Sequence, residues 1–167
     1  GVYGKGKAMF ETDVAIETRV LTDLYTDSEE ISKGHNVFYF DIEVSMKGGL
    51  PDIDTANNPI TSIAYLDKTT ETKRVLVLDE AGDIPHDKIE RNGVEVIRFD
   101  TERELLKAFL DQWQTLNPTI ISGYNIDYFD VPYLYRRLKR VFSEQIANQL
   151  SPINKVTYHK RRNRFFI

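Results

Sequence analysis

The stretch VFYFDIEVSM, residues 37–46, decides the fold that the sequence predicts. Apolar residues recur at every second position, which is the period of a β-strand with one buried face. The buried face is expected to carry Phe38, Phe40, Ile42, Val44 and Met46. The other face then carries two carboxylates, Asp41 and Glu43, about 6.5–7 Å apart at their Cα atoms. The sequence therefore predicts a core strand with two acidic side chains on one side.

The residues after this strand predict a mixed sheet. A loop rich in Gly, Pro, Asp and Asn, residues 47–59, precedes two β-type runs at 60–66 and 74–78, a spacing typical of an antiparallel meander. A loop is expected over 80–93, and VEVIRF and TIIS then predict a short strand and a buried parallel strand. The expected fold class is α/β, with a ribonuclease-H-like mixed β-sheet, an antiparallel meander plus a parallel strand, flanked by helices.

Two helices are expected in the second half of the chain. Thr101 and Glu104 form a capping box that opens the first helix, and Asn117-Pro118 ends it. Its apolar stripe comprises Leu105, Leu106, Phe109, Leu110 and Trp113. The second helix begins near Asp130, in the position of an N-cap. Residues 14–25, by contrast, alternate loosely and are interpreted as extended structure.

Charge is unevenly distributed along the chain. Residues 1–130 carry 13 Lys+Arg and 25 Asp+Glu, a net charge of −12, whereas residues 131–167 carry nine and one, a net charge of +8. An acidic body beside a basic segment fits a carboxylate metal site next to a phosphate-contacting surface, although a solvated basic helix and tail fit equally well. Arg136, Arg137, Lys139 and Arg140 accordingly either face a nucleic-acid backbone or solvate their helix.

Composition excludes several kinds of site. The chain has no cysteine, so a disulfide scaffold, a zinc-thiolate centre and a thiol nucleophile are excluded. Its three histidines lie in polar sequence without ligand spacing and are assigned no role. With no apolar run of membrane-spanning length and no signal-like N-terminus, the expected location is the cytoplasm, with no membrane partner.

The carboxylates are the strongest candidates for chemistry. Like charges at the spacing of Asp41 and Glu43 repel, and Mg²⁺ or Mn²⁺, which prefer oxygen ligands, would remove that penalty. From these residues alone, an exposed acidic strand face explains Asp-Ile-Glu as well, and a simple helix cap explains Asp130.

Taken together, the two clusters resemble a known family. A strand with Asp-x-Glu, in FYFDIEV, followed by Asn-x-x-x-Phe-Asp opening a helix, in ISGYNIDYFDVPYLYRRLKRVF, is similar to the first two exonuclease motifs of family-B DNA polymerases, most of all those of T-even-type tailed phages. The resemblance covers residues 18–158, and for a phage-encoded protein the expected cytoplasm is that of the host. It implies a 3′→5′ proofreading exonuclease region, residues 37–167, preceded by a lead-in from the polymerase N-terminal region, residues 1–36.

The resemblance also implies residue roles. Asp41, Glu43 and Asp130 would be catalytic carboxylates that bind two divalent metal ions, Mg or Mn, at the 3′ end of single-stranded DNA. Asn125 and Phe129 would position that end. Leu50, before Pro51-Asp52, matches the position of an aromatic wedge in the family.

The third motif of the family, Tyr-x-x-x-Asp, is missing. No aspartate follows Asp130, and Tyr158 is followed by HKRR. The expectation is an incomplete, inactive or weakly active site, completed by the remainder of the polymerase chain or by a second polypeptide. Two alternatives stay open: a non-catalytic module that binds single-stranded DNA or holds polymerase domains together, and a complete nuclease of another ribonuclease-H-like group that recruits an acid such as Glu144.

Overall fold

The computed structural model describes residues 14–29, 33–84, 88–159 and 164–167, which fall into two compact units, residues 1–34 and 35–167. In the first unit, α1 (Ile16–Tyr25) is a helix, so the prediction of extended structure for residues 14–25 was wrong. The physical reason is spacing, because Ile16, Val20 and Leu24 recur every fourth residue, as one face of a helix requires.

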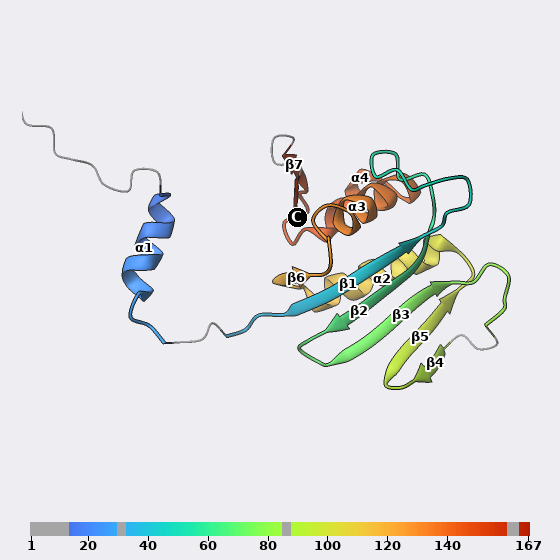
Figure 1. Ribbon diagram of the computed structural model, residues 1–167, viewed down its shortest axis with the longest axis horizontal. Coiled ribbons are helices and arrows are strands. Elements are labelled where there is room, and N and C mark those ends of the chain that lie inside the picture. Colours follow the sequence, from blue (N-terminus) through green and yellow to red (C-terminus); the bar gives the residue numbers. More distant parts are fainter. Residues whose placement is uncertain (1–13, 30–32, 85–87, 160–163) are drawn as a thin grey trace, which may run out of the picture. The chain divides into compact units, whose positions relative to one another are not determined.

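The second unit is built on a mixed sheet (Figure 1). Over the described ranges, six strands pair in the order β4-β5-β3-β2-β1-β6. They are β1 (Val37–Val44), β2 (Ile60–Asp67), β3 (Thr72–Leu78), β4 (Lys88–Arg91), β5 (Val94–Phe99) and β6 (Ile120–Ser122). β1, β2 and β3 form the predicted antiparallel meander, while β6 joins β1 and β5 joins β3 in parallel. The predicted mixed sheet is confirmed.

The predicted alternation of β1 is confirmed by burial. Phe38, Phe40 and Ile42 are buried, whereas Asp41 and Glu43 are exposed. Met46 lies beyond the strand and is exposed, so its predicted place on the buried face was wrong. The strand ends with a register shift between Glu43 and Val44, which re-aims the chain into the following loop.

Two details of the sheet differ from the sequence prediction. The predicted loop over 80–93 contains β4, which forms an antiparallel hairpin with β5 around Asn92 and Gly93. β6 is parallel, as predicted, but it is an edge strand, and Ile120 is exposed rather than buried. Because β6 has a neighbouring strand on one side only, its side chains remain partly in contact with solvent.

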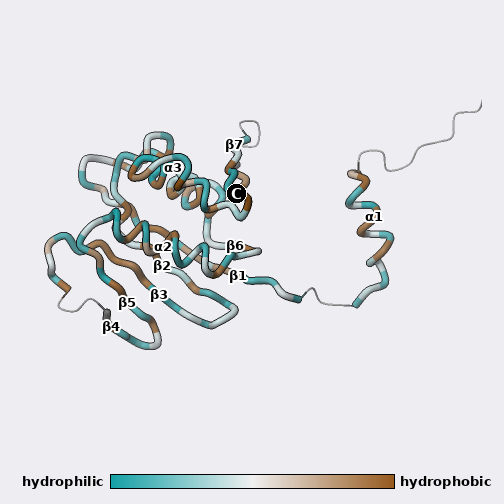
Figure 2. Tube along the Cα trace, turned by 180° about the vertical axis from the view of Figure 1, so that it is seen from behind, coloured by the Kyte–Doolittle hydropathy of each residue, from teal (hydrophilic) through white to brown (hydrophobic). Residues whose placement is uncertain are grey.

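The core lies between the sheet and α2 (Glu102–Leu116), which Figure 1 shows behind the strands. The predicted apolar stripe of α2 is buried in full. Phe109 packs on Phe38, Phe40 and Tyr65, with ring centroids 6.3, 5.8 and 6.2 Å away. Figure 2 shows hydrophobic residues along β3 and β5 as well. The face of β1 opposite its carboxylates is therefore the one that packs on the helix.

Caps fix both ends of α2. The Thr101 hydroxyl accepts a hydrogen bond from the Glu104 backbone N–H at 3.3 Å, as the predicted capping box requires. Asn117 ends the helix in the left-handed conformation, and its N–H donates to the Trp113 carbonyl at 2.9 Å.

The remaining elements follow the second predicted helix, α3 (Asp130–Val141). After it come α4 (Glu144–Ala147), a 3-10 turn η1 (Asn148–Leu150) and the antiparallel pair β7 (Thr157–His159) and β8 (Arg164–Phe166). α3 contacts β1, so the second helix begins beside the strand that carries the two carboxylates.

Candidate metal-binding and nuclease site

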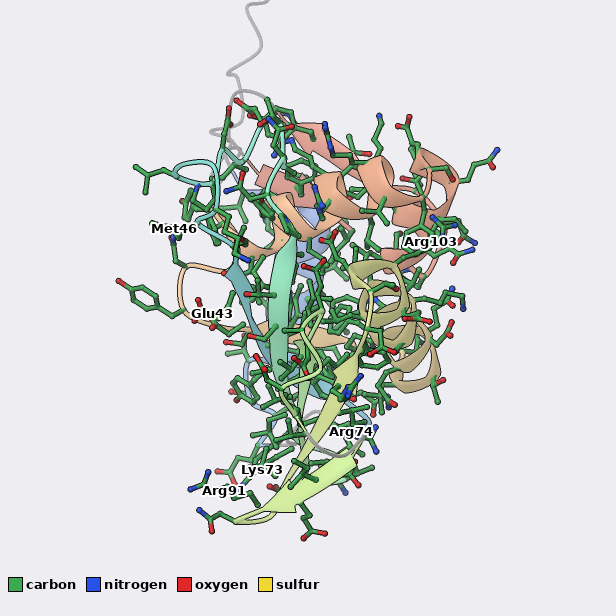
Figure 3. All side chains as sticks on the ribbon, turned by 90° about the vertical axis from the view of Figure 1, so that its right-hand side faces the viewer. Glu43, Met46, Lys73, Arg74, Arg91 and Arg103 are labelled. Atoms are coloured by element: carbon green, nitrogen blue, oxygen red, sulfur yellow. The ribbon has the colours of Figure 1, made fainter. Side chains whose placement is uncertain are left out.

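Asp41 and Glu43 project from what we call the carboxylate face of the sheet, which also carries their β2 partners Ala64 and Ser62. Both acidic side chains are exposed. In Figure 3, Glu43 lies on the opposite side of the sheet from Arg103 of α2. The two carboxylates are therefore reachable from solvent, while the other face of the same strand is sealed by the aromatic core.

Asp130 reaches the same strand from α3. Its side chain is 3% exposed, and its Oδ1 accepts a hydrogen bond from the backbone N–H of Ile42 at 3.0 Å. Ile42 stands between Asp41 and Glu43, so the second motif contacts the first through the backbone. The predicted N-cap role was wrong, because the cap is Phe129 and Asp130 is the first helical residue.

This contact exists because β6 is short. β6 pairs with β1 only as far as Ser122 opposite Tyr39, so the edge of β1 beyond that point needs other hydrogen-bond acceptors. A buried backbone N–H without a partner is costly. Asp130 supplies the acceptor for Ile42, which explains why a carboxylate is buried at this position.

The loop between β6 and α3 brings Asp130 into place. Gly123 passes so close to β1 that a Cβ atom there would lie 2.6 Å from the Phe40 carbonyl oxygen. Asn125 has a left-handed φ of 54°, and its carbonyl accepts hydrogen bonds from Tyr128 and Phe129, each at 3.0 Å. Sequence reasoning missed Gly123, although a glycine directly after a short strand is a signal of close backbone approach.

Gly123→Ala is expected to lower the free energy of unfolding by about 1–3 kcal/mol, as overpacking does, because the added Cβ would push β1 and the loop apart. Thermal denaturation measures the change. Tyr124→Ala is the matched control, since that neighbouring side chain is 93% exposed and should change stability little. Equal stability of Gly123→Ala and the unaltered chain would show that the close approach is not required.

Electrostatics link the three acids. Burial raises the pKa of Asp130 above its ordinary value of 3.8, and the negative charges of Asp41 and Glu43 raise it further, while the hydrogen bond from Ile42 opposes the shift. A cation placed among them would relieve both the repulsion and the burial cost.

Asp130→Asn is expected to stabilise the metal-free protein at pH 7 by about 0.5–1 kcal/mol, within the range of stabilising single substitutions. Because the folded-state pKa is raised, the wild-type chain loses stability as pH rises through that pKa. The advantage of asparagine should therefore shrink as pH falls through the ordinary aspartate pKa, because Asp130 then becomes protonated in both the folded and the unfolded state. Urea unfolding with EDTA at pH 7 and pH 3.5 tests this, and an undiminished advantage at the lower pH contradicts it.

The fit to a metal is partial. Carboxylate oxygens suit Mg²⁺ or Mn²⁺, and Asp41 and Glu43 are close enough to Asp130 to raise its pKa. Among the side chains that the structure describes, however, no three Asp, Glu or His residues are gathered closely enough to hold an ion. Asp130 is turned toward the Ile42 N–H, so the arrangement brings the acids to one strand without forming a closed ligand set.

The predicted DNA-positioning residues lie around this strand in different settings. Phe129 is partly buried and stacks on Tyr133 with ring centroids 5.5 Å apart. Asn125 is exposed in the loop after β6, and Leu50 is 81% exposed in the loop after β1. Packing therefore fixes Phe129, whereas Asn125 and Leu50 present their side chains to solvent.

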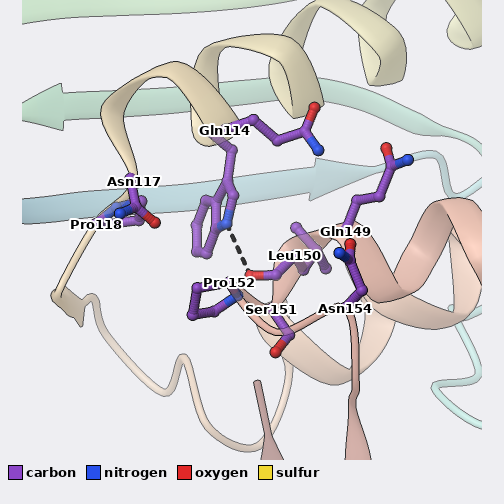
Figure 4. Close-up of a pocket in the computed structure, with 9 residues that line it drawn as sticks. Gln114, Asn117, Pro118, Gln149, Leu150, Ser151, Pro152 and Asn154 are labelled. Carbon is purple, nitrogen blue, oxygen red and sulfur yellow. Dashed lines mark hydrogen bonds between the residues drawn. The ribbon is translucent and has the colours of Figure 1, made fainter.

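A hollow of about 490 Å³ on the carboxylate face adjoins Asp41. Its wall includes Tyr39 and Tyr124, which are exposed, and the apolar residues Leu66 and Val75. A second pocket, of about 260 Å³, lies between the end of α2 and residues 149–154 (Figure 4). There the Trp113 indole donates to the Leu150 carbonyl at 2.9 Å, and no acidic residue lines the pocket.

The basic cluster of α3 is mostly engaged in ion pairs. Arg136 pairs with Asp54 at 3.0 Å and Lys139 with Glu144 at 2.9 Å, while Arg137 is buried against Glu102. Arg137 therefore neither faces solvent nor lies on an exposed phosphate-binding surface.

The mixed sheet, with a carboxylate-bearing strand and a helix that brings a third acid to it, is the arrangement that the resemblance to exonuclease domains predicts. Residues 7–167 match the family described as DNA polymerase family B, exonuclease domain, and the chain belongs to that family. Its sheet is accordingly of the predicted ribonuclease-H-like kind.

Among its relatives are polymerases of phages and archaea. The chain is 32% identical over 160 residues to the DNA-directed DNA polymerase of Escherichia phage RB69, covering 81% of this chain and 17% of that protein. It is 37% identical over 78 residues to the DNA-directed DNA polymerase of Enterobacteria phage T4, covering 46% and 8%. It is 38% identical over 122 residues to DNA polymerase 1 of Saccharolobus solfataricus, covering 71% and 13%. The chain thus spans less than a fifth of each relative. No helix in the described ranges is long and apolar enough to cross a membrane.

Proposed function

We propose that this chain carries the first part of a 3′→5′ proofreading exonuclease site that removes the terminal nucleotide of single-stranded DNA. The observation that carries the proposal is the hydrogen bond from Ile42 to Asp130, which joins the two acidic motifs at one point of β1. Family membership supports the same reaction class.

Asp41, Glu43 and Asp130 are proposed to hold two divalent metal ions, Mg²⁺ or Mn²⁺. When bound, such ions activate a water molecule and stabilise the leaving oxygen of an in-line displacement. The chain places two exposed carboxylates, Asp41 and Glu43, on one strand. It keeps the carboxylate of Asp130 close enough for their charges to raise its pKa. Asp130 must turn toward a bound ion, or share its second oxygen, to complete a ligand set.

Three further residues are proposed to position the strand end. Asn125 would hydrogen-bond to it and Phe129 would pack near the terminal nucleotide, since both lie in the segment that leads to Asp130. Leu50 would act as the wedge between the last bases, because it is exposed at the loop that follows the carboxylate strand. An aliphatic wedge gives weaker contact than an aromatic ring, whose stacking is worth about 1–3 kcal/mol per base.

The site is proposed to be incomplete in this chain, because the sequence has no Tyr-x-x-x-Asp motif and no aspartate after Asp130. A fourth carboxylate and a water-orienting tyrosine would come from the remainder of a polymerase chain or from a second polypeptide. We propose the division into a lead-in, residues 1–36, and a partial exonuclease domain, residues 37–167, on the same basis. Activity of the chain alone is then slight or absent.

Incubation of the purified chain with a single strand labelled at its 5′ end, in Mg²⁺ and then in Mn²⁺, tests this proposal. We expect little or no ladder of shortened products. Robust stepwise loss from the 3′ end that Asp130→Ala abolishes would contradict an incomplete site and favour a complete nuclease. Degradation that persists in Asp130→Ala would indicate a contaminating enzyme and requires a repeat with fresh protein.

The two alternatives fare differently. Recruitment of Glu144 as the missing acid is disfavoured, because Glu144 follows α3 and Asp130 begins it, and a helix of 12 residues is about 18 Å long. Glu144 is also paired with Lys139. A non-catalytic module for single-stranded DNA would use the same positioning residues, Asn125, Phe129 and Leu50, but would need no metal, so metal binding separates it from the leading proposal.

A further inference from the structure

The loop between β1 and β2, residues 47–59, is held against α3 by one buried arginine. Arg137 is 9% exposed, and its Nη1 donates to the backbone carbonyls of Ala56 and Asn57, both at 2.8 Å. Its Nε and Nη2 donate to the two carboxylate oxygens of Glu102 at 2.7 and 2.6 Å. One planar guanidinium therefore joins the loop to the first turn of α2.

Glu102 and Tyr133 extend this junction. Oε1 of Glu102 also accepts a hydrogen bond from the backbone N–H of Ile60, the first residue of β2, at 2.7 Å. The Tyr133 hydroxyl donates to the Asn58 carbonyl at 2.8 Å. The second half of the loop is thus bound to α3, and the first residue of β2 is bound to α2.

Asn58 carries the connection to the first half of the loop. Its side-chain amide donates to the carbonyls of Ser45, at 2.6 Å, and Gly49, at 3.0 Å. Gly49 immediately precedes Leu50. A continuous series of contacts therefore runs from Arg137, through residues 56–58, to the backbone beside an exposed leucine.

We infer that Arg137 is a positioning residue that fixes the loop, and with it Leu50, relative to Asp130. Asp130 and Arg137 lie on the same helix, seven residues or about 10.5 Å apart along its axis, so α3 sets the distance between a metal-site carboxylate and the loop anchor. The inference rests on the proposed function, because it gives Leu50 its place at the strand end.

The geometry distinguishes this role from that of a simple buried ion pair. A pair with Glu102 needs only a cation, but two loop carbonyls and two carboxylate oxygens at once need the fork of an arginine. Arg137→Lys keeps the charge and loses the simultaneous contacts. Asn58→Ala breaks the series at its other end and leaves no buried charge unpaired.

Amide hydrogen exchange of the full 167-residue chain tests whether Arg137 fixes the loop. We expect residues 47–55 to exchange at least about tenfold faster in Arg137→Lys and in Asn58→Ala, with β2 and β3 unchanged, because only the local opening becomes easier. The control is Arg103→Lys, which alters another arginine that donates to a backbone carbonyl, that of Val141 at 2.8 Å, but does not contact the loop. Unchanged exchange of the loop in both variants would overturn the inference.

A double-mutant cycle on DNA binding tests whether the anchor acts through Leu50. The probe is a short single strand with 2-aminopurine at its 3′ end, and its Kd is measured in Ca²⁺ by fluorescence. We expect Arg137→Lys to weaken binding about tenfold in the chain with Leu50 and less than about twofold in the Leu50→Ala background, since contacts that act as a unit are not additive. Asn58→Ala should behave in the same way.

If Arg137→Lys raised the Kd by the same factor with Leu50 and with Leu50→Ala, Arg137 would support the fold only, and the positioning role would be overturned. Failure of the unaltered chain to bind the strand would overturn the proposed function and, with it, the positioning role. The exchange experiment would still decide whether Arg137 holds the loop, so the two failures are distinguishable.

Discussion

Asp41→Ala is expected to weaken Mn²⁺ binding by at least about 100-fold, since even residues that only orient a metal ligand cost 10–100-fold when replaced. Asp41 is exposed on a rigid strand, beside Asp130 and Glu43, and nothing else in the motif can supply its oxygen atoms from that position. Isothermal titration calorimetry with MnCl₂ measures the change directly.

Asp54→Ala is the control for this experiment. Asp54 is an exposed acid in the loop after β1, paired with Arg136, and it is not part of the proposed site. Its replacement should leave the Mn²⁺ affinity within about twofold of the unaltered chain, because exposed charges act weakly at a distance in salt. Equal loss in both variants would indicate diffuse attraction of cations to an acidic surface.

Phe109→Ala is expected to lower the free energy of unfolding by about 3–5 kcal/mol, the usual cost of removing a buried aromatic ring. Phe109 is fully buried and packs against Phe38 and Phe40, the residues of β1 that alternate with its carboxylates. Chemical denaturation measures the loss. Because the same strand carries Asp41, we expect Mn²⁺ affinity to fall as the folded fraction falls.

Lys107→Ala, two residues earlier on the same helix, is the comparison. Lys107 is exposed and pairs with Asp111 one turn on, and such pairs contribute about 0.3–0.5 kcal/mol. A cost for Phe109→Ala as small as that of Lys107→Ala would contradict the assignment of the aromatic cluster as the support of the carboxylate strand.

The strand that decides the fold could be predicted because local and global signals agree in it. Because apolar and polar residues alternate strictly over residues 37–44, only one face of the strand can be buried, and that face is buried in the structure. The capping box at Thr101 likewise depends only on residues three apart. Such features need no knowledge of distant parts of the chain.

Features that depend on distant pairing were not predictable in the same way. Asp130 has the local sequence of a helix cap, and its role as acceptor for Ile42 follows only once β6 is known to end at Ser122. The partners of Arg137 lie 35, 80 and 81 residues away along the chain, and a run of basic residues does not reveal which of them is buried.

Two errors had signals that were present in the sequence. The hairpin of β4 and β5 turns at Asn92-Gly93, both with positive φ, and Asn-Gly is the strongest short-range hairpin signal. The charged residues of β4 hid it, because an edge strand tolerates charge on both faces. In α1, the four-residue spacing of the apolar positions outweighs their loose alternation.

The central claim is that Asp41 and Glu43 of the first motif and Asp130 of the second bind the same metal ions. A hydrogen bond between Ile42 and Asp130, which are 88 residues apart in the sequence, joins the two motifs. The most direct test is paramagnetic broadening of the backbone amide resonances of the ¹⁵N-labelled chain by substoichiometric Mn²⁺. The account predicts that broadening centres on residues 41–43 and 130 together and disappears in Asp41→Ala. Broadening centred on the acidic loop at Asp52 and Asp54, or on only one of the two motifs, would contradict it.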